Sequence, residues 1–233
     1  MDTEAANFWR ESAETLRWGR YLTQIESHAI RDGLRLCARP PKTGIDIGSE
    51  AGRFTGMLIE EGIRVTCTEI CPNKVRQCQR IHPTSNCVLV TPDDTTLPVE
   101  TRSIDFAISI EVEVVECEWF APELARVLTE GGVAVFTLNN RHSYRAAVSN
   151  IVAMMRRDEP YYNVSCREVE ERVRACGLAI EKKIGFGWAP FGRFSNSRLV
   201  APVTWAEDYL RLRQFARWSP WVAFICQKPS TVS

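Results

Sequence analysis

One stretch of the chain constrains its fold more than any other: residues 43–71, which read TGIDIGSEAGRFTGMLIEEGIRVTCTEIC. A short apolar run around Asp46 ends at Gly48, apolar side chains at helical spacing follow, and Gly62 precedes a β-rich run over 65–70. A parallel pair of strands joined by one helix places the first turn beside the end of the second strand. The sequence therefore predicts a βαβ unit with a ligand site at that edge.

The chemistry of that edge is typical of a nucleotide site. Gly48 and Gly52 leave the backbone bare where a ligand approaches, and a helix that begins near Gly52 offers free N–H groups. Glu69 closes the second strand, where a carboxylate can accept hydrogen bonds from both hydroxyls of a ribose. Glu50 and Arg53 break the dinucleotide fingerprint G-x-G-x-x-G, so a nicotinamide-dependent oxidoreductase is the less favoured alternative.

An acid inside the first strand, then G-x-x-x-G, then an acidic end to the second strand resembles the class I S-adenosylmethionine-dependent methyltransferases, with a type-11-like domain. The resemblance implies S-adenosylmethionine as cofactor. It also implies cofactor contacts from the strand ends and the turn between them: Asp46 near the amino-acid part, Gly48, Ser49, Glu50 and Gly52 under the methionine and sugar, and Glu69 with Ile70 at the ribose. The family's usual turn has a glycine at position 50. We expect the Glu50 side chain to point away and bond to a backbone N–H; an inward carboxylate facing the cofactor's positive charge is the alternative.

The resemblance continues in order as far as residue 138. An apolar strand over 87–90 precedes TPDDTTLP, which resembles the family's acid-x-x-x-Leu-Pro run, and a fourth strand over 103–110 precedes an acidic loop. The resemblance implies cofactor contacts just past these strands, from Asp93, Asp94, Thr95 and Glu111. A carboxylate beside the adenine amino group favours adenine, although the two aspartates could instead cap a turn. PELARVLTEGGVAVFTL then resembles a helix through Leu128, a double-glycine turn and a fifth strand over 133–138.

The implied fold is α/β: a Rossmann-like, seven-stranded, mostly parallel sheet with helices on both faces. The last strand, over 221–226, is expected to lie antiparallel between the fifth and sixth strands. We expect a single methyltransferase domain over 1–233, with an N-terminal helical cap, a cofactor-binding core and two substrate-side insertions: 1–42, 43–138, 139–164 and 185–219. Leu22, Ile25 and Ala29 mark the core-facing side of the helical cap.

Fewer sequence features indicate which residues bind the methyl acceptor. The loop after the fourth strand reads EVEVVECEW and lacks the histidine that many family members carry there. His142, in the first insertion, is the best-placed catalytic base, since its unperturbed pKa is about 6.5; a structural loop histidine is the alternative. Aromatic side chains in the second insertion indicate an apolar or aromatic substrate wall, and equally a satellite core or a homodimer surface. We therefore expect methyl transfer to an oxygen or nitrogen of a small molecule, with a non-catalytic S-adenosylmethionine-binding module as the alternative.

Composition limits which binding partners and which cellular compartment we expect for this protein. Lysine plus arginine equals aspartate plus glutamate at 29 each, so no net field attracts nucleic acid or an acidic membrane. No apolar run is long enough to span a bilayer, and the acidic start lacks a signal core, which favours the cytoplasm. The nine cysteines include no C-x-x-C pair and none with histidine at zinc-finger spacing, so we expect reduced core thiols and no metal site.

Overall fold

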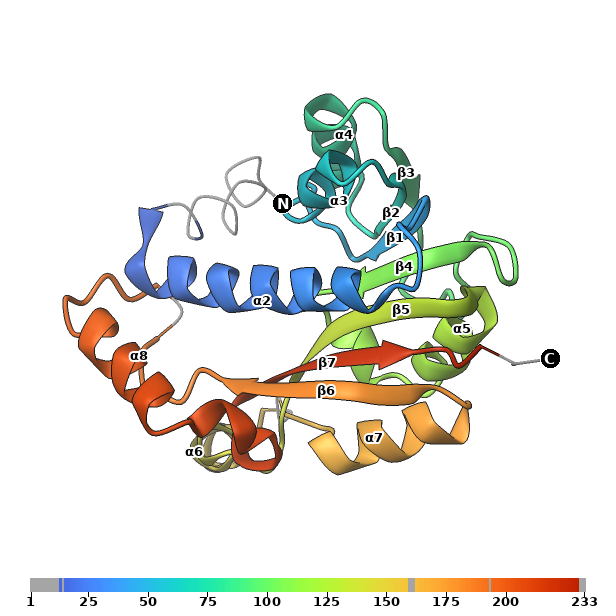
Figure 1. Ribbon diagram of the computed structural model, residues 1–233. Coiled ribbons are helices and arrows are strands. Elements are labelled where there is room, and N and C mark those ends of the chain that lie inside the picture. Colours follow the sequence, from blue (N-terminus) through green and yellow to red (C-terminus); the bar gives the residue numbers. More distant parts are fainter. Residues whose placement is uncertain (1–12, 14, 159–161, 193, 231–233) are drawn as a thin grey trace.

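The computed structural model describes residues 13, 15–158, 162–192 and 194–230, and Figure 1 shows their strands in one twisted sheet between helices. The strands lie in the order β3-β2-β1-β4-β5-β7-β6, with β7 antiparallel to β5 and β6 and the other neighbouring pairs parallel. The predicted Rossmann-like sheet is therefore confirmed, including its antiparallel last strand. The strands are β1 (Thr43–Ile47), β2 (Arg64–Glu69), β3 (Asn86–Leu89), β4 (Ile104–Ser109), β5 (Leu128–Asn139), β6 (Ala179–Phe186) and β7 (Trp221–Gln227).

Helices cover both faces of the sheet and bury an apolar core on each. On one face lies α2 (Arg17–Leu36), with Leu22, Ile25 and Ala29 in the core as predicted, and beside it α3 (Thr55–Glu60) and α4 (Pro72–Ile81). Residues 1–12 of the expected cap lie outside the described part of the chain. The opposite core includes side chains of α5 and α7. The helical segments after α4 are η2 (Glu113–Glu116), α5 (Phe120–Val127), α6 (Tyr144–Arg156), α7 (Cys166–Ala175), α8 (Val200–Tyr209), η3 (Leu212–Gln214) and η4 (Ala216–Trp218).

The strand order reverses at β1, which lies between β2 and β4. The chain runs from β1 outward to β2 and β3, and then returns across the sheet to β4. The helix that follows β1 packs on one face, whereas η2 and α5, which follow β4, pack on the other. Connections that part in this way leave a crevice outside the carboxyl ends of the strands, where α/β proteins bind ligands.

One boundary between a helix and a strand differs from the sequence prediction. Helical spacing predicted a helix through Leu128 that ends at a double-glycine turn, but α5 ends one residue earlier and β5 begins at Leu128. Leu128 pairs with Ile104 of β4, and the Gly131 N–H donates to the Lys228 carbonyl at 2.8 Å. These partners are distant in sequence. The local residue pattern therefore does not reveal the hydrogen bonds between strands that hold this segment in an extended conformation.

Candidate functional site

A cavity of about 590 Å³ opens outside the carboxyl ends of β1 to β4, within the range of about 300–1,000 Å³ typical of ligand sites. Its lining comes from the segments that follow these strands, within 46–54, 68–74, 90–98 and 110–119. None of the described residues of the two insertions lines this cavity. The predicted site at the strand ends is therefore a real concavity, but the insertions contribute no wall to it.

Glu69, at the end of β2, presents a buried carboxylate to the cavity. Its Oε2 accepts a hydrogen bond from the Glu50 N–H at 2.9 Å, and its Oε1 accepts from the N–H groups of Ile70 at 2.9 Å and Cys71 at 3.0 Å. Three backbone donors thus fix the orientation of one side chain. A carboxylate has about four lone-pair sites, so Oε2 can accept a further hydrogen bond from a ligand.

Asp46, on β1, is buried and lines the same cavity. The Thr55 hydroxyl at the start of α3 donates to its Oδ2 at 2.7 Å. Burial raises the pKa of Asp46 to about 7, which the Thr55 hydrogen bond opposes and the nearby Glu69 reinforces. Near neutral pH this carboxyl is therefore divided between its neutral and charged forms.

The turn between β1 and α3 contains residues in the left-handed backbone conformation. Gly48 has a φ of 70° and lines the cavity, and a Cβ there would come within 2.7 Å of the Val112 side chain. Gly52 has a φ of 80°, but a Cβ there would collide with the ring of His82, and Gly52 is absent from the cavity lining. The absence of a side chain at Gly48 therefore lets Val112 pack against the turn at the cavity. The absence of a side chain at Gly52 lets the end of α4 pack against the same turn.

Glu50 takes a left-handed conformation, with a φ of 55°, and its side chain lines the cavity. Its Oε1 lies 3.2 Å from the ammonium of Lys74 on α4, which also lines the cavity. Burial raises the pKa of Glu50 to about 7, against the opposing effect of Lys74. We expected this carboxylate to accept a hydrogen bond from a neighbouring backbone N–H. It is instead paired with the Lys74 ammonium at the cavity wall.

Arg53 forms a buried ion-pair network that sequence reasoning missed. Its Nη1 donates to Glu111 at 2.8 Å, and its Nη2 donates to Glu26 and to Thr23 of α2, both at 2.6 Å. Its guanidinium also lies 4.6 Å from the ring centroid of Phe54. Burial opposes the charge, but the two carboxylates raise the pKa of Arg53 further. The network joins α2 to the turns after β1 and β4, including the predicted site residue Glu111.

The segment after β3 brings only one of its three predicted residues to the cavity. All four residues from Asp93 to Thr96 are exposed, but only Asp94 and Thr96 line the cavity. The Asp94 Oδ2 accepts a hydrogen bond from the Thr91 N–H at 2.7 Å. Asp94 therefore caps the turn, as the alternative interpretation held, and this cap sets which side chains face inward.

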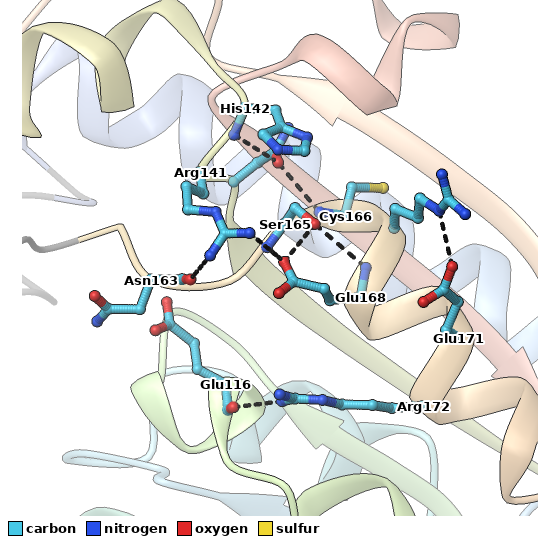
Figure 2. Close-up of polar contacts among 11 residues, drawn as sticks. Glu116, Arg141, His142, Asn163, Ser165, Cys166, Glu168, Glu171 and Arg172 are labelled. Atoms are coloured by element: carbon cyan, nitrogen blue, oxygen red, sulfur yellow. Dashed lines mark hydrogen bonds and ion pairs between the residues drawn. The ribbon is translucent and has the colours of Figure 1, made fainter.

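His142 is exposed and does not line the cavity. Figure 2 shows it in a polar cluster at the start of α7, where the side-chain oxygen of Asn140 accepts from the N–H groups of His142 at 3.2 Å and Cys166 at 3.1 Å. A capping box of Ser165 and Glu168 at the start of α7 belongs to the same cluster. For His142 to act as a base, an acceptor would have to extend beyond the cavity.

Aromatic residues of the second insertion pack into a core. The ring of Phe191 lies 5.4 Å from that of Trp18, and the ring of Phe186 lies 5.9 Å from that of Trp221. These side chains are not among those that line the cavity. They therefore belong to the apolar core under α2 and form neither a substrate wall nor a separate satellite core, while Trp205 on α8 is exposed.

Residues 45–136 match the family model of a methyltransferase domain. These residues form a class I methyltransferase domain. The match runs from β1 into β5, and so contains the segments that line the cavity. S-Adenosylmethionine is the cofactor that such a domain implies.

Solved structures share the fold of this methyltransferase domain at low sequence identity. The N-methyltransferase NodS from Bradyrhizobium japonicum, in complex with S-adenosyl-L-homocysteine, has a TM-score of 0.61 and 12% identity, over 94% of this chain and 91% of that one. The geranyl diphosphate C-methyltransferase from Streptomyces coelicolor, also with S-adenosyl-L-homocysteine, has a TM-score of 0.62 and 14% identity, over 97% and 86%. The [4+2]-cyclase SpnF has a TM-score of 0.57 and 14% identity, over 88% and 81%. A shared fold therefore leaves the reaction open.

No curated protein matches the sequence of this chain at a significant level. Within the described residues, no helix has the length and hydropathy that crossing a membrane requires.

Proposed function

We propose that this chain is a methyltransferase that moves the methyl group of S-adenosylmethionine to an oxygen or nitrogen of a small molecule. The observation that carries the proposal is the Glu69 carboxylate, buried at the strand-order reversal and fixed by three backbone N–H groups. A carboxylate held in this way is suited to a ligand hydroxyl that donates to Oε2, because orienting the side chain costs little further entropy on binding.

The cavity fits the proposed cofactor in shape and in polarity. The Ser49 hydroxyl oxygen is buried at the cavity and has no hydrogen-bond partner among the described residues, so a ligand could supply one. Ile70 lines the cavity with 57% of its surface exposed, and a ligand against it would cover that apolar side chain. We assign Ser49, Glu69 and Ile70 to the sugar side, Asp46 and Gly48 to the amino-acid side, and Asp94 with Thr96 to the adenine.

The charge of the cavity favours a cationic ligand. The lining contains six acidic residues against two basic ones, Arg53 and Lys74; the acids are Asp46, Glu50, Glu69, Asp94, Glu111 and Glu113. Arg53 is paired with Glu111, and Lys74 with Glu50. The remaining carboxyls could therefore stabilise an ammonium and a sulfonium inside a partly dry site.

The acceptor would lie beside the segment after β4. Val112, Val114 and Trp119 present apolar surface to the cavity there, which supports an apolar or aromatic acceptor. When bound, S-adenosylmethionine supplies a methyl group already activated by positive charge on sulfur. The residues of this chain would contribute mainly by holding the acceptor in line with that methyl and by excluding water. A base is needed only for an acceptor whose proton is held tightly.

The proposal is tested in two steps. Isothermal titration should detect binding of S-adenosylmethionine and S-adenosylhomocysteine and none of NAD. Mass spectrometry would then follow methyl transfer to a panel of phenols, alcohols and amines. Methylation of any of these confirms the enzyme; binding without transfer to any acceptor favours the non-catalytic module, and NAD binding alone favours the oxidoreductase.

Self-association is a separate proposal. Val148, Ile151, Met154 and Met155 of α6 are exposed, and a second copy of the chain could cover this apolar helix. Sedimentation equilibrium would detect the dimer, and Met154→Lys should shift it to the monomer.

A further inference from the structure

Three thiols meet on the face of the sheet that α4 covers, behind the cavity. Cys67 of β2 and Cys87 of β3 are direct partners in the parallel register, so their side chains leave the same face of the sheet. Cys78 of α4 packs onto them, and the three sulfurs lie within 4.8 Å of one another. Cys67 and Cys78 are buried, and Cys87 is half-buried. Two strands and one helix thus each place one cysteine sulfur, a soft metal ligand, in the same small region.

We propose that this thiol cluster, Cys67, Cys78 and Cys87, is a structural binding site for a thiophilic divalent metal ion such as Zn²⁺. Thiolates select ions of this class over hard cations. Zinc–sulfur bonds of about 2.3 Å in tetrahedral geometry place sulfurs about 3.8 Å apart, so the cluster needs only a small contraction. A divalent ion also leaves less net negative charge among three buried thiolates than a monovalent ion does.

His82 is the proposed fourth ligand. It follows Cys78 by four residues at the end of α4, so the two side chains lie on the same side of the helix. Both contact Gly52: a Cβ there would lie 2.9 Å from the His82 Nε2 and 3.0 Å from the Cys78 sulfur. The His82 Nε2 now lies 3.0 Å from the Gly52 carbonyl oxygen, and the ring would rotate from it toward the sulfurs. Three cysteines and one histidine form a common ligand set for structural zinc.

Metal binding would require the thiols to lose their protons. Coordination therefore releases thiol protons to solvent, and zinc affinity should increase with pH. The site is independent of methyl transfer, since none of the three cysteines lines the cavity.

The ion would nevertheless stabilise one wall of the cavity. It would tie α4 and the edge strand β3 to β2, the strand that ends in Glu69. The Cys67 sulfur also lies 3.3 Å from the Thr55 hydroxyl, which in turn donates to Asp46 at 2.7 Å. Loss of the Cys67 proton would therefore change the hydrogen bonding behind a cavity residue.

The first experiment titrates reduced, metal-free protein with Zn²⁺ against a chromophoric chelator, with bound metal counted by mass spectrometry. The full-length chain should bind one zinc ion, and Cys78→Ala should bind it more than about 100-fold more weakly. Cys176→Ala is the matched control, because Cys176 is a half-buried thiol outside the cluster, and it should retain wild-type affinity. His82→Ala should lose about 10-fold. Equal affinity in Cys78→Ala and Cys176→Ala overturns the cluster, and equal affinity in His82→Ala and wild type overturns the fourth ligand.

A second experiment uses the wild-type chain, so it does not depend on whether the variants fold. Zn²⁺ should protect Cys87 from alkylation at least 10-fold, while exposed Cys117 is labelled at an unchanged rate. The peptides that contain each thiol would be quantified by mass spectrometry. Equal labelling of Cys87 with and without Zn²⁺ overturns the proposal.

Discussion

Asp46→Asn is expected to stabilise the protein increasingly as the pH rises. Burial raises the pKa of Asp46 from 3.8 to about 7, so the native state keeps a proton that the unfolded state has already released. The stability of the wild type should therefore fall between about pH 4 and pH 7 on account of this one group, and level off above pH 7. Asparagine removes this dependence, since its side chain stays neutral and its oxygen can still accept from Thr55.

The magnitude follows from the shift in pKa. Between pH 5 and the folded pKa of about 7 lie about two pKa units, each about 1.4 kcal/mol, so the advantage of Asp46→Asn should grow by about 3 kcal/mol between pH 5 and pH 8. Urea unfolding of wild type and variant at both pH values measures this difference, and contributions from other titrating groups cancel between the two proteins.

Asp105→Asn is the matched control with the opposite sign. Burial opposes ionisation there, but hydrogen bonds from the Lys42 and Thr43 N–H groups and from Thr129 lower the pKa of Asp105. Its ionised form stabilises the fold at neutral pH, and that contribution is lost as the pH falls through its lowered pKa. Asp105→Asn should therefore destabilise most at neutral pH. A pH-independent effect of Asp46→Asn would refute the assigned burial penalty.

Three further predictions concern the cofactor site and a helix cap outside it. Glu69→Ala should weaken S-adenosylhomocysteine binding by about 1.5–3 kcal/mol in a calorimetric titration, whereas exposed Glu61→Ala should leave it unchanged. Glu50→Gly should keep cofactor affinity and relieve about 1 kcal/mol of left-handed strain; a native protein that fails to bind while Glu50→Gly binds would identify Glu50 as a blocking residue. Ser165→Ala should lower the free energy of unfolding by about 1 kcal/mol through loss of the N-cap of α7, with cofactor affinity unaffected.

The alternation of apolar runs and glycine turns was enough to predict the main strands and, together with the family resemblance, their order. A parallel strand, its turn and its helix are local patterns, so Gly48 and Glu69 could be placed at one sheet edge before any tertiary contact was known. The capping box of Ser165 and Glu168 is likewise a local feature, because both partners lie within one helical turn.

Tertiary contacts decided which side chains of a loop face inward. The cap that Asp94 makes on Thr91 turns Asp94, and not Asp93, toward the cavity. The hydrogen bonds of Asn140 hold the chain around His142 at an exposed turn. A one-residue offset in a loop costs little in local conformational energy, so sequence pattern does not choose between the alternatives.

The sequence by itself determined the sheet, the cavity edge and the family of the domain. Only the tertiary structure decided that Arg53 joins two carboxylates from distant segments, and that three of the nine cysteines meet at one point. Cys67, Cys78 and Cys87 follow no zinc-binding spacing in the chain, because each comes from a different element and the register of β2 with β3 brings them together. Convergence of this kind depends on how strands pair and helices pack, which short-range residue patterns do not encode.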